Sequence, residues 1–295
     1  MTRNGLCLLQ VHAHPDDEAS KGAGVTARYA DEGVRNVLVT ATGGEAGDIL
    51  NPAADTPETR ARLYEIRIEE LQRSVEILGY DAVHLLGYRD SGMPDTEPNA
   101  HPHAFANADL DDAVGKLVAV IREERPQVLI TYSDSQERYP HPDHLRVHDI
   151  SVAAFDAAAD PERYPDAGEP WQPLKLYYVG FTKRALELAH QSYEQAGIES
   201  PVAKWLDAFP DGHDERWRTR IDVASYVARK RESLLAHRTQ IAPDWFWLRL
   251  PPELAQTAYR FEDFCLARSL VDPVYDGDGF ETDLFSGIRE GAGAR

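Results

Sequence analysis

Two short runs of histidine and aspartate supply most of the reactive side chains that this chain brings together. The first is His14-Pro15-Asp16-Asp17-Glu18, and the second, far downstream, is His141-Pro142-Asp143-His144. A divalent metal ion is bound by imidazole nitrogens and carboxylate oxygens that converge from rigid elements. The two runs offer more such groups than metal binding requires, which leaves a carboxylate to act as a general base. The pattern therefore predicts hydrolysis, with a metal-bound water as the nucleophile.

The first run follows a predicted buried strand. Residues 5–12 form a short, nearly continuous apolar segment, which is typical of a strand buried on both faces. Pro15 ends this segment, and residues 20–32 are predicted to form a helix that stops at Gly33. The first run therefore occupies a strand-to-helix turn at the carboxyl end of a strand.

The second run has the same local setting. Residues 128–132, Val-Leu-Ile-Thr-Tyr, predict another buried strand, after which polar residues lead into His141. A helix with apolar residues from Ile150 to Ala159 follows, and we expect Asp143 to cap it. The second run also follows the carboxyl end of a strand.

The segments between the two runs alternate between strand and helix patterns. Residues 36–41 and 82–86 are predicted strands, whereas residues 57–78 and 110–124 are predicted helices. This alternation indicates an α/β, Rossmann-like fold with a mostly parallel, doubly wound sheet. In the strand order 3-2-1-4-5, the first and fourth strands are neighbours at the switch point, so the two runs face each other across one crevice.

The C-terminal half is predicted to be an extension of this sheet. It contains a surface loop at 161–173, a strand at 176–181, a helix at 220–240 and an irregular tail at 276–295. We interpret residues 1–295 as a single catalytic domain, with the metal site built mainly from 1–160 and a substrate-pocket extension in 161–295.

Composition narrows the functional class. The chain has 295 residues with 42% hydrophobic residues, enough for a large core, and its formal charge of -19 argues against nonspecific binding to nucleic acid or anionic membranes. Because no signal-peptide pattern or membrane-spanning apolar run is present, we expect a cytoplasmic protein. Cys7, in a predicted strand, and Cys265, in a predicted helix, are interpreted as core residues and not as a disulfide.

Each candidate ligand also has a purely structural interpretation. His12 and His14 point to one side of an extended segment, where a lone histidine is more often structural. The adjacent aspartates and the distant second run shift the balance to metal binding. His148 lies one helical turn after His144, but we expect it to support the site, because three protein ligands leave a position open for water.

The remaining candidates are weaker when taken alone. Residues 43–48 either line a polar ligand or form a flexible loop. Arg67 and Asp90 could bind sugar hydroxyls, although such residues usually lie on the surface. Lys21 is of interest because it lies beside the first run.

Taken together, the two runs resemble those of the LmbE-like, or PIG-L, family of metal-dependent N-deacetylases. Within that superfamily, the chain is most similar to the branch of mycothiol S-conjugate amidases, and the similarity extends over nearly the whole chain. The stretches that carry it are 20–23, 30–33, 42–45, 49–52, 165–171, 175–179 and 281–288.

The resemblance implies a role for each residue of the two runs. His14, Asp17 and His144 match the metal ligands, and Asp16 matches the general base. His141, in its protonated form, matches the group that stabilises the oxyanion and assists the leaving amine.

It also implies roles for residues around these runs. Asp143 is the orienting partner of His141, and Tyr139 matches a mobile tyrosine that contacts the reacting carbonyl. Asp48, Arg67 and Asp90 match positions that bind the glucosaminyl-inositol part of the substrate. We expect Lys21 to reach the acyl side.

One segment departs from the family pattern. Relatives commonly carry a glycine pair just before the tyrosine, whereas residues 134–138 of this chain contain none. The absence of these glycines restricts the backbone of a loop that moves in the resembling enzymes.

We therefore expect a metal-dependent amide hydrolase that converts mycothiol S-conjugates to an N-acetylcysteine S-conjugate and glucosaminyl-inositol. The alternatives are an N-acetylglucosaminyl-inositol deacetylase, an amidase paralogue acting on a thiol conjugate in natural-product biosynthesis, and a noncatalytic metal-containing binding domain. The expected cofactor is one divalent ion, Zn²⁺ in the first place, although histidine and carboxylate ligands also suit Fe²⁺. The expected partner is a small-molecule thiol conjugate or aminosugar-inositol, and neither nucleic acid nor a membrane.

Overall fold

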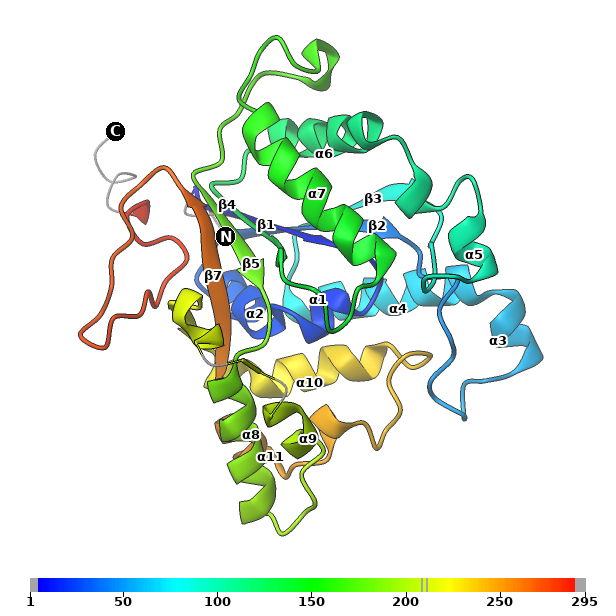
Figure 1. Ribbon diagram of the computed structural model, residues 1–295, viewed down its shortest axis with the longest axis vertical. Coiled ribbons are helices and arrows are strands. Elements are labelled where there is room, and N and C mark those ends of the chain that lie inside the picture. The colour runs from blue at the N-terminus through cyan, green and yellow to red at the C-terminus, as the bar shows by residue number, and fades with distance from the viewer. Residues whose placement is uncertain (1–4, 208, 211, 290–295) are drawn as a thin grey trace.

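A seven-stranded sheet forms the centre of the protein in the computed structural model, which describes residues 5–207, 209–210 and 212–289 (Figure 1). The strand order is β3-β2-β1-β4-β5-β7-β6. Strands β1 to β5 pair in parallel, whereas β7 is antiparallel to both β5 and β6. The strands are β1 (Cys7–His12), β2 (Arg35–Thr42), β3 (Ala82–Tyr88), β4 (Val128–Tyr132), β5 (Lys175–Val179), β6 (Thr219–Asp222) and β7 (Phe261–Ser269).

Helices cover both faces of this sheet. Leu9 and Val11 belong to the apolar cluster that includes α6 and α7, whereas Leu8 packs in a cluster with Tyr29 of α2. Figure 1 shows α6 and α7 on one side of the sheet and α2 and α4 on the other. The helices are α1 (Asp17–Ser20), α2 (Ala23–Asp31), α3 (Pro57–Ala61), α4 (Leu63–Leu78), α5 (Glu97–Ala100), α6 (Leu110–Glu124), α7 (Pro142–Ala157), α8 (Lys183–Gln195), α9 (Ala203–Leu206), α10 (Val227–Ala236) and α11 (Pro252–Ala258).

The doubly wound sheet and the order 3-2-1-4-5 are confirmed. Two helix predictions need correction, because each helix is interrupted. The helix predicted at 20–32 is split at Lys21 and Gly22, where Gly22 has φ 80° and a Cβ atom would lie 2.6 Å from Gln10 Oε1. The helix predicted at 57–78 is split at Arg62, between α3 and α4.

The prediction of one helix at 220–240 is also wrong in part. Its first residues belong to the strand β6, and only Val227–Ala236 is α-helical. Cys265 lies in β7, not in a helix, although both it and Cys7 are buried free thiols as expected. Strand β6 is short and pairs with a strand far along the chain, so its local sequence carries little signal.

The C-terminal half is attached to the sheet through buried polar contacts. Glu281 is completely buried and contacts Lys175 Nζ at 2.5 Å, and it accepts hydrogen bonds from Tyr177 at 2.8 Å and Thr219 at 2.7 Å. Residues 276–288 contain no helix or strand, which agrees with the predicted irregular segment, and 290–295 lie outside the described residues. Within the described ranges, no helix has the length and hydropathy needed to cross a bilayer.

We expect Glu281→Ala to destabilise the protein strongly. The substitution leaves the buried Lys175 ammonium without its counter-charge, which costs about 3–5 kcal/mol in comparable pairs. The free energy of unfolding measured by denaturant titration checks this. Arg260→Ala, which breaks the more exposed pair with Asp222, is the matched control and should cost about 1 kcal/mol or less.

Candidate active site

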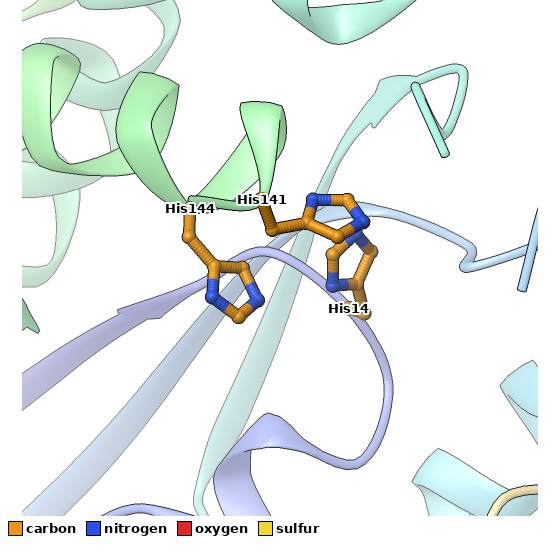
Figure 2. Close-up of side chains that lie close together, drawn as sticks. All are labelled: His14, His141 and His144. Carbon is orange, nitrogen blue, oxygen red and sulfur yellow. The ribbon is translucent and has the colours of Figure 1, made fainter. Parts of the chain in front are cut away.

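The two histidine-aspartate runs meet at the carboxyl ends of β1 and β4. These strands are parallel neighbours, with Leu9 paired to Leu129, so the segments that follow them emerge side by side. Figure 2 shows the rings of His14, His141 and His144 gathered between the β1 turn and the first turn of α7. The ring centroids are 4.6 Å apart for His14 and His141, 5.1 Å for His141 and His144, and 5.3 Å for His14 and His144.

Asp17 lies between two of these histidines. Its Oδ2 atom is 3.5 Å from His14 Nδ1 and 3.5 Å from His144 Nε2. The same oxygen accepts a hydrogen bond from the Tyr132 hydroxyl at 2.6 Å, and the Tyr132 ring stacks on His144 with centroids 4.3 Å apart. All these groups are buried, so two imidazole nitrogens and one carboxylate converge on a small volume.

This donor set is suitable for a divalent metal ion. Nitrogen and carboxylate ligands fit Zn²⁺ and Fe²⁺. Two groups of described residues bring their ligand atoms within 4.8 Å of one another, namely His14 with His141 and His144, and His14 with Asp90 and Asp143, and neither of these groups contains Asp17. His14 is shared by both groups and by the predicted set, which makes it the central residue of the cluster.

The second nitrogen of His14 faces carboxylates. Its Nε2 atom lies 3.2 Å from Asp143 Oδ2 and 3.7 Å from Asp90 Oδ1. Ser91 in turn donates its backbone N–H to Asp143 Oδ2 at 3.0 Å and its hydroxyl to Oδ1. A carboxylate on the outer nitrogen fixes the orientation of a metal-binding histidine, so Asp143 holds His14 in place.

The prediction that Asp143 caps α7 is therefore wrong. The cap is the side chain of His141, whose Nδ1 accepts a hydrogen bond from the Asp143 N–H at 3.2 Å. The Asp143 carboxylate instead lies against His14 Nε2 and accepts a hydrogen bond from the Ser91 hydroxyl. The hydrogen bond between Asp143 and His141 thus runs through the backbone of Asp143.

The two histidines beside Asp17 carry different charges in the metal-free protein. Burial alone lowers the pKa of His14, but the Asp143 and Asp17 carboxylates outweigh burial and raise that pKa to about 10. Burial lowers the pKa of His144 to about 3, and the attraction of Asp17 offsets this only in part. At neutral pH, His14 is an imidazolium and His144 is neutral.

If His14 is a metal ligand, as the resemblance implies, we expect metal binding to release a proton from its ring. A metal ion can bind Nδ1 only after its proton leaves, so about one proton should be released per ion. The apparent affinity should therefore rise roughly tenfold for each pH unit and level off only as the pH approaches the His14 pKa of about 10. Calorimetry in buffers of different ionisation enthalpy measures the released proton, and a value of zero would contradict this assignment.

Asp16 is held in an unusual backbone conformation next to an arginine. It has φ 115°, which residues other than glycine rarely adopt. Arg67 Nη2 donates to Asp16 Oδ2 at 2.8 Å and to the Pro15 carbonyl at 2.5 Å. Burial raises the pKa of the Asp16 carboxyl, and Arg67 counteracts this only in part. A carboxylate with a raised pKa is better suited to accept a proton.

The glycine loop after β2 makes room for this arginine. Arg67 Nη1 donates to the Gly44 carbonyl at 2.5 Å, and a Cβ atom at Gly44 would lie 2.3 Å from Arg67 Cζ. Gly44 also has φ 70°, so glycine is required there for two reasons. The loop at 43–48 is therefore a cradle for Arg67.

His141 and Tyr139 both approach His144. The Tyr139 side chain is exposed, and its ring centroid is 5.6 Å from that of His144. Burial and the nearby positive His14 lower the pKa of His141, which favours a neutral imidazole over the protonated form that the resemblance implies. Because Nδ1 accepts a hydrogen bond, the neutral ring carries its hydrogen on Nε2 and can still donate it.

Of the four predicted substrate-binding residues, Lys21, Arg67 and Asp90 contact residues of the first run. Lys21 Nζ lies 2.5 Å from Asp17 Oδ1. Asp90 is buried and accepts hydrogen bonds from Ala46 N and Gly92 N. Arg67 is buried against Asp16, whereas Asp48 is exposed on the glycine loop.

His148 has the supporting place that was predicted for it. Its Nδ1 atom is 3.0 Å from the Tyr132 carbonyl oxygen. Neither His148 nor Asp17 belongs to the groups of described residues whose ligand atoms lie within 4.8 Å of one another.

Comparison with known proteins agrees with this geometry. The family model described as GlcNAc-PI de-N-acetylase (PIG-L) matches residues 9–155. Mycothiol S-conjugate amidase from Streptomyces coelicolor is 41% identical in an alignment that covers 97% of this chain and 99% of that protein. The chain belongs to the PIG-L family.

Other PIG-L relatives are almost as similar. The 1D-myo-inositol 2-acetamido-2-deoxy-alpha-D-glucopyranoside deacetylase of Thermobifida fusca is 40% identical, with 96% of this chain and 100% of that protein covered. The solved structure of N,N'-diacetylchitobiose deacetylase from Pyrococcus horikoshii has the same fold, with a TM-score of 0.60, 17% identity and coverage of 89% of this chain and 84% of that one. The protein is therefore a hydrolase of amide bonds, an amidase or deacetylase of the PIG-L family.

Sequence reasoning did not single out four residues of this PIG-L site. Ser91 orients Asp143, Tyr132 contacts Asp17, and Glu18 and His237 form a buried pair. A hydroxyl at the end of a buried strand was an available signal for Tyr132, and Glu18 stands within the first run itself. His237 lies outside the segment matched by the family model, and its sequence neighbourhood gives no sign of the role.

Proposed function

We propose that this protein cleaves the amide of mycothiol S-conjugates, releasing an N-acetylcysteine S-conjugate and glucosaminyl-inositol. The observation that carries the hydrolytic part is Asp16, a carboxylate with a raised pKa beside a ready-made ligand cluster. The choice of substrate is supported by the similarity to the Streptomyces coelicolor protein, which is named an amidase of these conjugates. We take residues 1–295 as one catalytic domain, because β6 and β7 extend the same sheet that carries the cluster.

We assign His14 Nδ1, Asp17 and His144 Nε2 as the metal ligands. Asp17 Oδ2 faces both nitrogens, and this set leaves His141 available to donate a hydrogen bond. A bound divalent ion, Zn²⁺ in the first place, polarises the amide carbonyl and lowers the pKa of water. Three protein ligands leave a position open for substrate or water.

Different residues of the protein then handle the proton of the water and the charge on the carbonyl oxygen. Asp16, oriented by Arg67, accepts the proton of the attacking water. His141 Nε2–H donates a hydrogen bond to the developing oxyanion, and the exposed Tyr139 reaches the carbonyl. The leaving amine receives the proton that Asp16 removed from the water, so the proton transfer balances. Lys21, Asp48, Arg67 and Asp90 border the space that the conjugate occupies.

A second candidate is deacetylation of N-acetylglucosaminyl-inositol. It is supported by the Thermobifida fusca relative, which bears that name and is 40% identical over nearly its whole length. Both reactions hydrolyse an amide on the same glucosamine nitrogen, so the same cluster serves either.

Product analysis tests the proposal. The metal-loaded protein is incubated separately with a mycothiol S-conjugate and with N-acetylglucosaminyl-inositol, and products are identified by mass spectrometry. We expect the N-acetylcysteine S-conjugate as the main product, with higher kcat/KM than for acetate release. Faster release of acetate would establish the deacetylase instead, and the absence of both products would refute both candidates.

A further inference from the structure

We propose that His237 positions the general base Asp16 by acting through the buried carboxylate of Glu18. The inference rests on the proposed role of Asp16 and adds a residue from the C-terminal half to the catalytic apparatus. His237 does not touch the space in which substrate is expected, so it is a positioning residue.

The first step is a continuous chain of buried hydrogen bonds. His237 Nε2 lies 2.6 Å from Glu18 Oε1, and both side chains are completely buried. The other oxygen of the same carboxylate, Oε2, accepts the backbone N–H of Asp16 at 2.9 Å. A single carboxylate thus joins His237 directly to the backbone of the base.

The second step is that the backbone of Asp16 must be held in its unusual conformation by neighbouring groups. Asp16 has φ 115°, and such a conformation persists in a residue other than glycine only when its surroundings enforce it. Arg67 fixes the Asp16 carboxylate and the Pro15 carbonyl, but the N–H of Asp16 is held by Glu18. Glu18 therefore controls the part of the turn that Arg67 does not hold.

The third step is the dependence of Glu18 on His237. A buried carboxylate oxygen that loses a hydrogen-bond partner is left unsatisfied, and its side chain tends to move. The Ser74 hydroxyl also donates to Glu18 Oε1, and Ser233 lies 2.7 Å from Ser74, but the His237 ring lies directly against this oxygen at 2.6 Å and fills the space beside it. Without His237, the Glu18 side chain shifts, and its hydrogen bond to Asp16 weakens.

The segment that carries His237 is itself anchored to the site. His237 directly follows α10, which lies beside α4 (Figure 1). Thr239 donates its N–H and hydroxyl to Glu70 of α4, the helix that also carries Arg67. Gln240 Nε2 donates to the Asp48 carbonyl of the glycine loop at 3.1 Å. Residues 237–240 therefore bring together the turn, the helix and the loop that enclose Asp16.

The test compares His237→Ala and His237→Gln in the full-length, metal-loaded protein. Glutamine can donate an N–H to Glu18 without carrying charge, whereas alanine cannot donate. Comparing the two variants therefore shows whether the hydrogen bond to Glu18 is what matters. The control is His84→Ala, which removes a different His–Glu pair, His84 with Glu124 at 2.9 Å, on β3. The measurements are kcat, KM, metal retention during dialysis against a weak chelator, and a crystal structure of each variant.

We expect His237→Ala to lower kcat by at least about thirtyfold, with KM and metal retention changed less than about threefold. His237→Gln should recover at least about tenfold of that loss. In the crystal structure of His237→Ala, Asp16 should leave the positive φ region and lose its hydrogen bond to Glu18. His84→Ala should keep the kcat of the unaltered protein.

Three results would overturn the proposal: an equal loss of kcat in His84→Ala, an equal loss in the alanine and glutamine variants, or an unchanged Asp16 backbone in His237→Ala. The crystal structures judge the positioning role without any turnover. If the unaltered protein cleaves neither substrate, the proposed function fails while the Asp16 geometry still decides this inference.

Discussion

Asp16→Asn is expected to abolish most turnover while the protein retains its metal ion. The asparagine has nearly the same shape, tolerates the positive φ better than most residues and can still accept a hydrogen bond from Arg67. It has no basic carboxylate, however, and positioned general bases typically contribute about 10²–10⁴-fold to the rate. We expect a loss of kcat in that range, measured by steady-state kinetics beside metal analysis of the same sample.

Two comparisons make this result interpretable. Asp16→Ala should lose a similar amount of activity, because the missing group is the base in both variants. If instead the asparagine variant kept kcat within about tenfold of the original, proton transfer to Asp16 would not limit the rate. A loss of metal from Asp16→Asn would assign Asp16 to the ligand set and contradict its role as an outer base.

The parallel part of the fold could be predicted because its signals are local. Residues 128–132 and 110–124 were predicted with the bounds that β4 and α6 have in the structure. The meeting of the two runs then follows from geometry, since adjacent parallel strands end at the same edge of the sheet. Strands β6 and β7 form an antiparallel pair across a long intervening segment, and no local pattern indicates that pairing.

The interruption of the helix predicted at 20–32 also depends on a contact between distant residues, which a local sequence pattern does not show. Gly22 has φ 80°, and the Gln10 side chain occupies the space where a Cβ atom would lie, so both the backbone and the packing require glycine there. That contact joins a strand to a helix, so it depends on tertiary packing and not on helix propensity. Residues 20–32 alone contain a plausible helical pattern.

Within the site, residue types were predictable but partners were not. The sequence identifies His14, Asp17 and His144 as groups that could meet, and the structure brings them together. It does not reveal that the Asp143 carboxylate faces His14, because several donors compete for one buried carboxylate and only packing decides among them. Arg67 likewise gave no sign in the sequence that it would lie against Asp16.

Substitution of a proposed metal ligand gives the second large effect. His144→Ala should lose its metal ion and, with it, nearly all turnover. Removing an outer partner of a ligand already costs about 10–100-fold in metal affinity, so removing a ligand should cost at least about 100-fold. Metal content after dialysis against a weak chelator, measured by mass spectrometry of the metal, checks this expectation.

The neighbouring histidine is a matched control for His144. His148 lies one turn later on α7 and contacts the Tyr132 carbonyl oxygen, so His148→Ala removes an imidazole of the same helix without removing an assigned ligand. We expect it to retain metal to within about tenfold of the original affinity. Stoichiometric metal in His144→Ala, under conditions where the original protein is also saturated, would count decisively against the assignment.

A further pair of variants decides between the two ligand sets that share His14 and His144. If Asp17 is the third ligand, Asp17→Ala should lose metal whereas His141→Ala should keep metal and lose turnover, because His141 then serves only as a hydrogen-bond donor. If His141 is the third ligand, as the mutual approach of the three rings also permits, the two outcomes are exchanged. We expect the first outcome, since Asp17 Oδ2 lies 3.5 Å from a nitrogen of each shared histidine, while His141 Nδ1 is already engaged with the backbone of Asp143. Metal retention thus identifies the ligand, and turnover in the variant that keeps its metal identifies the donor.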